Sequence, residues 1–393
     1  AALEGFNTEK AKGAFGFINE EIGRLKNELE KIGFSKIISF GKIFTPLARE
    51  IPGAINDAAN ISARVLSLSE TADTLTKNAF RMAFNKEGDK LLSLLRELQG
   101  DLRAVTELSS SLKSHASALQ INLPDDYLTM NVRLYRGEAL LGSILGLLEK
   151  NQDLHLVILF QNPSEIRPAG GFIGSYADIT LDNGSIINID VRDIYDPDGW
   201  IEEKITPPEP LRAITDVWEA RDANWFFDFP TSAEKVLSMF GRSKMYQEKN
   251  IAFAGALAIN VRLIEDLLAV LGEIPLPEYG LIITKNNFLE AVQKEVESGE
   301  DKTKGEPKKI LKVLTPIILE RLANMDGKAK REIAEIFKNR IETKDILAYA
   351  RDRVLEGYLE NEHMGGEIYS PEGAGSDDYL AVVHANIAGG KTD

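Results

Sequence analysis

The sequence predicts a mixed α/β (α+β) fold, in which an N-terminal antiparallel helical bundle or coiled-coil stalk precedes a mixed sheet flanked by helices. Two observations support this prediction. The first third of the chain has apolar residues at alternating steps of three and four, which is a heptad pattern. From about residue 131, strand-like apolar runs alternate with helical ones. We therefore assign residues 1–125 to the bundle and residues 126–393 to the α/β domain.

Three apolar seams predict the helices of the bundle. They cover residues 15–32, 58–82 and 91–119. The polar residues 85–89 are typical of a hairpin between the second and third helices, and residues 122–126 end the third. Helices joined by such a short turn run antiparallel and bury their seams against each other.

A basic amphipathic stretch lies between the first two helices, over residues 33–53. Its phenylalanines and isoleucines are interleaved with Lys36, Lys42 and Arg49. Such a stretch either lies on a membrane surface or is buried against the body of the protein. Pro46 interrupts it, and burial is the commoner outcome.

The second part of the chain begins with a predicted helix over residues 131–151 and a strand over residues 154–161. Two strands follow, over 172–181 and 185–193, and they are joined by Asp182-Asn183-Gly184, in which the Asn-Gly pair is a strong hairpin signal. The further elements that we expect are strands over 251–259 and 281–284, a helix over 261–272, and helices over most of 286–361. The apolar residues of 251–283 either line a lipid pocket or form ordinary core, which is the commoner case.

Composition excludes several classes of function. The net charge of -15 argues against a nucleic-acid partner, because such proteins need a basic face. The absence of cysteine excludes disulfides, thiolate zinc sites, iron-sulfur clusters and cysteine nucleophiles. No segment approaches the length of a membrane span, and no signal peptide opens the chain. We expect a fragment of a longer protein whose membrane anchor lies outside this sequence.

The run Arg167-Pro168-Ala169-Gly170-Gly171 follows the strand over 154–161 directly. Pro168 favours an extended backbone at Arg167, and the two glycines permit positive φ and close approach of a ligand to the main chain. Free amides beside a guanidinium predict a cradle for a phosphate or a carboxylate. The alternative is a structural corner whose arginine pairs with an acid.

Two further runs combine arginine with carboxylates. Such a mixture either holds a phosphate together with magnesium or forms structural ion pairs. Thr231 or Ser232 is expected to cap a helix. The four histidines have no metal or triad spacing, and hydrolase and P-loop motifs are missing from the sequence. The residues of the two runs are Arg192, Asp193 and Asp196, and Arg221, Asp222, Asn224 and Asp228.

Three runs resemble an uncharacterised family of bacterial envelope proteins, domain of unknown function 4012. They are RPAGGFIGS, RDANWFFDFPTSA and HANIAGGK, and they occur in the expected order over roughly residues 150–393.

More distantly, the body resembles the LytR-CpsA-Psr family. The similar segments are the hairpin ending Val191-Arg192-Asp193, the strand-helix-strand region over 249–277, and the helix over 305–322. This resemblance implies an extracytoplasmic phosphotransferase that moves a glycan from a polyprenyl pyrophosphate to the cell wall. It also implies a LytR-CpsA-Psr-like sheet and a magnesium ion.

The resemblance assigns roles to individual residues. Arg192 and Asp193 fall on the arginine and aspartate of the family's P-R-D motif, and Lys308 and Lys309 fall near its pyrophosphate-binding arginines. Where the family has a metal-binding aspartate before the hairpin, this sequence has the glycine pair at 170 and 171.

We therefore expect an extracytoplasmic, membrane-anchored cell-envelope protein that binds a polyprenyl-pyrophosphate-linked glycan or another anionic envelope ligand. Transfer of the glycan is left open. The alternative is a non-catalytic surface scaffold or adhesion protein, although Trp200, Trp218 and Trp225 lack the spacing of an aromatic platform. The expected residues are Arg192, Asp193 and Asp222 for catalysis; Arg167, Gly170, Gly171, Arg221, Asn224, Lys308 and Lys309 for ligand binding; and Asp193 and Asp228 for Mg²⁺.

Overall fold

The computed structural model has the predicted combination of a helical region and a mixed sheet flanked by helices. Contacts divide the chain into two compact units, one of residues 1–79 and 89–147 and the other of residues 80–88 and 148–393. The residues that the structure describes are 8–33, 46–123, 127–150, 153–368 and 380–386.

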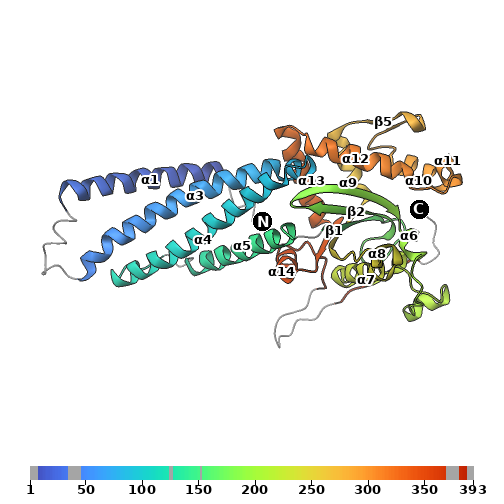
Figure 1. The fold of residues 1–393 in the computed structure, drawn as a ribbon, viewed down its shortest axis with the longest axis horizontal. Coiled ribbons are helices and arrows are strands. Elements are labelled where there is room, and N and C mark those ends of the chain that lie inside the picture. The colour runs from blue at the N-terminus through green and yellow to red at the C-terminus, as the bar shows by residue number, and fades with distance from the viewer. Residues whose placement is uncertain (1–7, 34–45, 124–126, 151–152, 369–379, 387–393) are drawn as a thin grey trace. The chain divides into compact units, whose positions relative to one another are not determined.

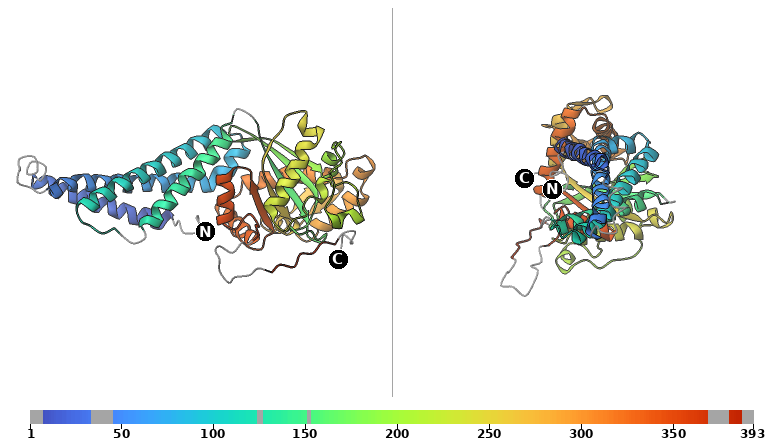
Figure 2. Two further views of the ribbon diagram at one scale, coloured as in Figure 1. Left: turned by 90° about the horizontal axis from the view of Figure 1, so that it is seen from below. Right: turned by 90° about the vertical axis from the view of Figure 1, so that its left-hand side faces the viewer.

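Four helices lie side by side in the first unit (Figures 1 and 2). They are α1 (Thr8–Lys31), α3 (Pro46–Phe84), α4 (Gly88–Ala118) and α5 (Tyr127–Leu148). The first three correspond to the three predicted seams. Much of the basic amphipathic stretch, residues 34–45, lies outside the described residues, and α3 begins at the proline of that stretch.

The helix expected over 131–151 is α5, and it packs against α4. The Tyr127 hydroxyl donates a hydrogen bond to the Ser109 carbonyl over 2.7 Å, and Arg103 Nε lies 2.9 Å from Glu138 Oε1. Both contacts join residues of the helical unit. This helix therefore adds a fourth member to the predicted bundle.

Polar pairs also link α3 to α4 inside this unit. Arg64 Nη1 lies 2.6 Å from Oδ1 of Asp101, whose side chain is almost fully buried. The His115 ring lies between two carboxylates of α3, with Nδ1 2.6 Å from Glu50 Oε2 and Nε2 3.5 Å from Asp57 Oδ2. Such pairs hold only in one register of the two helices, so they add specificity to the apolar seam.

The second unit contains a five-stranded sheet in the order β3-β2-β1-β4-β7. The central strand β1 runs antiparallel to β2 and parallel to β4, so β1 and β4 end at the same edge. Asn183 and Gly184 have positive φ in the turn between β2 and β3, as the Asn-Gly signal predicts. The strands are β1 (Leu154–Asn162), β2 (Phe172–Asp182), β3 (Ser185–Asp193), β4 (Phe253–Asn260) and β7 (Ile346–Ala350).

Helices cover both faces of this sheet. On one face, Val157 and Leu159 of β1 join a core cluster that contains the apolar side of α7 (Phe229–Arg242). On the other face, Ile158 and Phe160 contact a second cluster. The helices of that second cluster are α9 (Val261–Leu271), α10 (Phe288–Ser298), α12 (Lys309–Ala323) and α13 (Gly327–Glu342).

The short elements connect these layers. The strand expected over 281–284 is β6, which pairs with β5 in a separate two-stranded sheet. The remaining elements are α6 (Tyr195–Asp198), η1 (Glu209–Ala213), η2 (Ala220–Asp222), α8 (Lys244–Gln247), β5 (Ile274–Leu276), η3 (Pro277–Tyr279), β6 (Leu281–Ile283), α11 (Glu300–Thr303) and α14 (Arg353–Asn361).

The strand β7 lies within the region that we predicted to be mainly helical. Its sequence, Ile346–Ala350, is a five-residue apolar run. Such a run is compatible with either a buried strand or a piece of helix, and only pairing with β4 makes it a strand.

In the part of the chain that the structure describes, every helix is too short or too polar to cross a membrane.

Candidate functional site

Gly170 and Gly171 complete the loop between β1 and β2. Their φ angles are +100° and +147°, which disfavour any residue with a side chain. A Cβ atom on Gly170 would lie 2.5 Å from Gln161 Oε1, and one on Gly171 would lie 2.5 Å from the Asn162 carbonyl oxygen. The glycine pair thus allows the loop to fold back onto the end of β1.

The polar groups of this loop are bonded to the protein itself. The Ala169 carbonyl accepts hydrogen bonds from Gln161 Nε2 (2.8 Å) and Asn224 Nδ2 (3.0 Å). Asn224 Nδ2 also donates to the Gly171 carbonyl over 2.7 Å, and the Gly170 amide donates to the Arg167 carbonyl. Because Asn224 is fully buried, these contacts give it a role in fixing the loop.

Arg167, the guanidinium of the expected cradle, is itself largely covered. Its side chain is 8% exposed, and Nη2 lies 4.0 Å from Asp222 Oδ1. The guanidinium carbon lies 5.2 Å from the centre of the Phe172 ring, and Nη1 donates to the Ile166 carbonyl. The structure thus brings Arg167 and Asp222 together, as a weak pair at the upper limit of an ion-pair distance.

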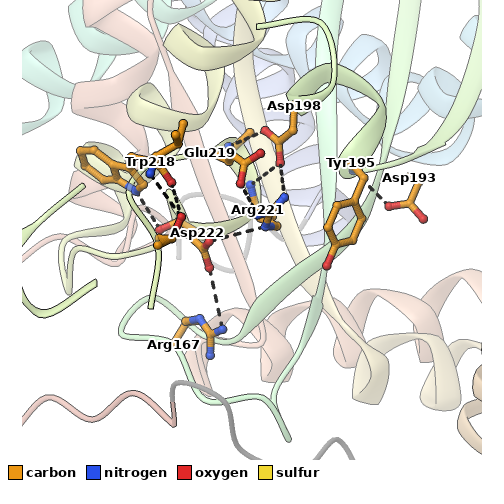
Figure 3. A network of polar contacts seen from close by, with 11 residues as sticks. Arg167, Asp193, Tyr195, Asp198, Trp218, Glu219, Arg221 and Asp222 are labelled. Atoms are coloured by element: carbon orange, nitrogen blue, oxygen red, sulfur yellow. Dashed lines mark hydrogen bonds and ion pairs between the residues drawn. The ribbon is translucent and has the colours of Figure 1, made fainter. Parts of the chain in front are cut away.

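Arg221 is the centre of a charged network that includes Arg167 and Asp222 (Figure 3). Its guanidinium pairs with Glu219 and lies 3.7 Å from Asp198 and 3.6 Å from Asp222. It also stacks over Tyr195, with the ring centre 4.9 Å from the guanidinium carbon. Two arginines therefore face three carboxylates.

Burial changes the acidity of this network. It raises the pKa of Asp198 to about 6, although Asp198 Oδ1 accepts a 2.6 Å hydrogen bond from the Ala220 amide. Burial also raises the pKa of Asp222, against the opposing charges of Arg221 and Arg167. Both carboxylates are costly to ionise, so the nearby guanidinium groups are largely occupied in compensating them.

A second charged group stands at the end of β3. Arg192 Nε donates to Asp190 Oδ2 over 2.6 Å, and Nη1 lies 4.0 Å from Asp196 Oδ2. Asp193 Oδ1 accepts a 3.1 Å hydrogen bond from the Tyr195 amide. Burial and the charge of Asp193 raise the pKa of Asp196. The carboxylates here outnumber the single arginine.

An apolar cavity of about 210 Å³ lies at the edge where β1 and β4 end. Its walls come from β1, β4, α9, α10 and α12. Among the apolar side chains that line it are Phe160, Ile259, Ile264, Val292, Leu311 and Ile318. The polar lining residues include Glu165, Ser175, Tyr195, Asn260, Glu297 and Lys308.

The two lysines of the expected ligand site have different surroundings. Lys308 lines the cavity, and its Nζ lies 3.8 Å from the position that a Cβ atom on Gly174 would occupy. Lys309 instead has its Nζ 3.5 Å from Asp301 Oδ1. Tyr195 connects the cavity to the charged network, because it lines the cavity and carries Arg221 over its ring.

Comparison with known families gives one match. Residues 151–296 match the family model described as protein of unknown function, DUF4012. We call residues 151–296 the DUF4012 region. It includes β1, the glycine loop, the charged network and α9, whereas Lys308 and Lys309 lie beyond its end. The chain matches no curated protein. The resemblance to LytR-CpsA-Psr proteins is not shown by these comparisons and stays a hypothesis.

The carboxylates expected to bind magnesium accept hydrogen bonds from backbone amides. Asp228 caps α7, with Oδ2 accepting from the Thr231 amide (3.0 Å) and Oδ1 accepting from the Ile368 amide (3.1 Å). Among the described residues, no three side chains of the types His, Cys, Asp and Glu are grouped as a metal site requires. Asp193 and Asp228 each accept a hydrogen bond from a backbone amide, so magnesium binding at either residue stays a prediction, and no chemical step is derived through that ion.

The sequence did not identify several residues of the DUF4012 region and its surroundings. Asp198 and Glu219 complete the charged network, and Tyr195 joins it to the cavity. The apolar steps of three and four in α10 and α12 were a detectable signal for the cavity walls, but the same pattern is typical of ordinary core.

Proposed function

We propose that this protein binds a phosphorylated lipid carrier of the cell envelope, with the lipid chain in the apolar cavity and the phosphate beside Lys308. The observation that carries the proposal is a cavity with apolar walls and an ammonium group in its lining. In this proposal the protein is extracytoplasmic and anchored through a segment outside this sequence. The bound lipid carries a glycan on its phosphate.

The apolar walls supply the binding energy for the chain. Each buried CH₂ group contributes about 0.8 kcal/mol, so even a short isoprenoid tail gains several kcal/mol from the cavity. The ammonium adds a charge-assisted contact to the phosphate, and Ser175 offers a neutral donor nearby. This division into an apolar tail site and a polar head site suits an amphiphile.

Lys308 is the cation on which the proposal depends, because it lines the cavity. The other three expected pyrophosphate ligands, Lys309, Arg167 and Arg192, are not among the residues that line it. The proposal therefore places a phosphate at Lys308 rather than a pyrophosphate held by all four cations.

A non-catalytic role is the second candidate. It is favoured by the charged network, in which Arg167 and Arg221 are matched by Asp198, Glu219 and Asp222. Groups that already compensate one another are poorly placed to neutralise a transferred phosphoryl group. Binding of the carrier without glycan transfer is therefore the simpler proposal.

Binding is tested with farnesyl phosphate, a short carrier analogue, and with farnesol, which lacks the phosphate. Wild type should bind farnesyl phosphate about tenfold more tightly than farnesol, equivalent to about 1.4 kcal/mol. Lys308→Gln should remove that preference, and Val292→Trp, which fills the cavity, should weaken both ligands. Lys204→Gln, at an exposed site away from the cavity, is the matched control. Unchanged affinities in Lys308→Gln and Val292→Trp would reject the proposal.

Transfer is tested separately, by release of pyrophosphate-linked lipid with and without magnesium. The non-catalytic proposal expects no release by wild type or by Arg167→Ala. Magnesium-dependent release by wild type that is lost in Arg167→Ala would instead support the transferase interpretation and assign Arg167 to it.

A further inference from the structure

A second cavity, of about 550 Å³, lies along the outer side of α7. Thr231, Glu234, Lys235 and Ser238 of this helix line it, at spacings of three and four that place them on one side. Aromatic residues from three other segments complete the lining. They are Trp218, Phe226 and Tyr349.

The ammonium of Lys235 is the cation that lines this second cavity. It lies 4.1 Å from the centre of the Trp218 ring. Burial and the charge of Arg242 lower the pKa of Lys235, and the charge of Glu203 opposes that shift. An anionic group entering the cavity would gain a charged partner there.

The carboxylate of the second cavity is already satisfied. Arg351 pairs with Glu234 through Nε (2.8 Å) and Nη2 (2.9 Å), and the Tyr349 hydroxyl donates to Glu234 Oε2 over 2.8 Å. The charges of Glu234 and Arg351 therefore cancel. Lys235 gives the cavity a local positive charge although the chain as a whole carries -15.

We propose that this second cavity binds a pyranose ring that carries a carboxylate. The carboxylate would accept hydrogen bonds from the Lys235 ammonium, and the hydroxyls of Thr231 and Ser238 would contact sugar hydroxyls. Phe226 and Tyr349 offer flat apolar surfaces for the C-H face of the ring. This site is independent of the cavity at Lys308 and of the function proposed for it.

The chemistry of the lining selects this class of ligand. A neutral sugar would leave the ammonium with its contact to the Trp218 ring, whereas a carboxylate would give it an ionic partner. Thr231 Oγ1 donates to Asp228 Oδ2 and can still accept from a sugar hydroxyl, and the Ser238 hydroxyl can donate or accept. A sugar acid matches the single charge, the hydroxyls and the aromatic surfaces together.

Calorimetry and saturation-transfer NMR with D-glucuronate, D-glucose and acetate test the site. Wild type should bind glucuronate at least tenfold more tightly than either glucose or acetate. Lys235→Gln should weaken glucuronate binding about tenfold, whereas Lys235→Arg should retain most of it. Ser238→Trp, which fills the cavity and leaves Lys235 in place, should abolish binding. Lys249→Gln, an exposed lysine elsewhere, should bind like wild type.

Three results would overturn this inference: no glucuronate binding by wild type, equal affinity for glucuronate and glucose, or undiminished binding by Lys235→Gln. Lys308→Gln should leave glucuronate binding unchanged. Loss of farnesyl phosphate binding and loss of glucuronate binding are thus separate outcomes.

Discussion

Single residues show why a charged cluster is not by itself an anion site. Arg221 has three carboxylate neighbours and an aromatic ring, so its charge is used within the protein. Lys308 lines a cavity whose walls are mainly apolar. From the sequence alone, Arg221 is a cation in a loop and Lys308 is a cation at the start of a helix, and nothing local distinguishes their surroundings. Their different surroundings come from side chains that are distant in the sequence.

Gly171 is expected to be intolerant of a side chain. Gly171→Ala places a Cβ atom 2.5 Å from the Asn162 carbonyl oxygen at a φ of +147°, so the loop must shift. We expect the free energy of unfolding to fall by about 1–3 kcal/mol. Denaturant unfolding followed by tryptophan fluorescence measures this, because all three tryptophans lie in the α/β unit.

Gly357→Ala is the matched control for that change. This glycine lies inside α14, and a Cβ atom added to it would have no heavy atom within 4 Å, so alanine should stabilise the protein by up to about 1 kcal/mol. Equal stability of Gly171→Ala and wild type would show that the glycine loop is not fixed by close packing.

Asp198 is expected to make stability depend on pH. Its pKa in the folded protein is about 6, above its ordinary value of about 3.9. The folded state therefore binds the proton more tightly, and the contribution of this group to stability is present at low pH and is lost as the pH rises through 6.

Urea unfolding at several pH values, for wild type and Asp198→Asn, checks this sign. Between about pH 4 and 6.5 the wild type should lose stability relative to the variant, with a slope that approaches about 1.4 kcal/mol per pH unit near pH 5 and vanishes above the folded pKa. Parallel stability curves for the two proteins would mean that Asp198 titrates normally.

At the scale of elements, periodicity and turn chemistry were sufficient to predict most of the helices and strands. Three seams predicted α1, α3 and α4, and the Asn-Gly turn predicted the hairpin of β2 and β3. These signals are local, because they arise from one helix face or one turn. The strand β7 was missed because its five apolar residues carry no local signal that distinguishes strand from helix.

The start of α7 provides a test at this scale, since Asp228 was expected to bind a metal and is found capping the helix. Asp228→Ala should lower the free energy of unfolding by about 1–2 kcal/mol, because the Thr231 and Ile368 amides lose their acceptor. Asp228→Asn keeps an acceptor oxygen and should cost less.

Thermal unfolding of wild type and Asp228→Asn, with and without magnesium, tests whether Asp228 also binds the metal. Stabilisation of wild type by magnesium that disappears in Asp228→Asn would contradict the capping role.

At the scale of the whole molecule, net charge acts on ligand association. The chain carries -15 and has an isoelectric point near 5.0, so it repels an anionic ligand at long range. Raising the salt from about 0.02 to 0.2 M shortens the screening length and should speed association of farnesyl phosphate about two- to threefold. Stopped-flow kinetics measures this, with farnesol as the uncharged control. Slower association at high salt would indicate a locally positive approach to the cavity.

Local sequence was enough to specify most of the helical and strand segments, the hairpin, the acidic character of the chain and the need for glycine beside Arg167. These properties depend on composition or on neighbours within a few residues. Tertiary packing was needed to decide that β1 lies between β2 and β4, that α10 and α12 wall a cavity at the end of these strands, and which carboxylates face each arginine. The physical reason is that cavities and ion pairs are made by side chains far apart in the sequence, and their energy depends on burial and distance rather than on local pattern.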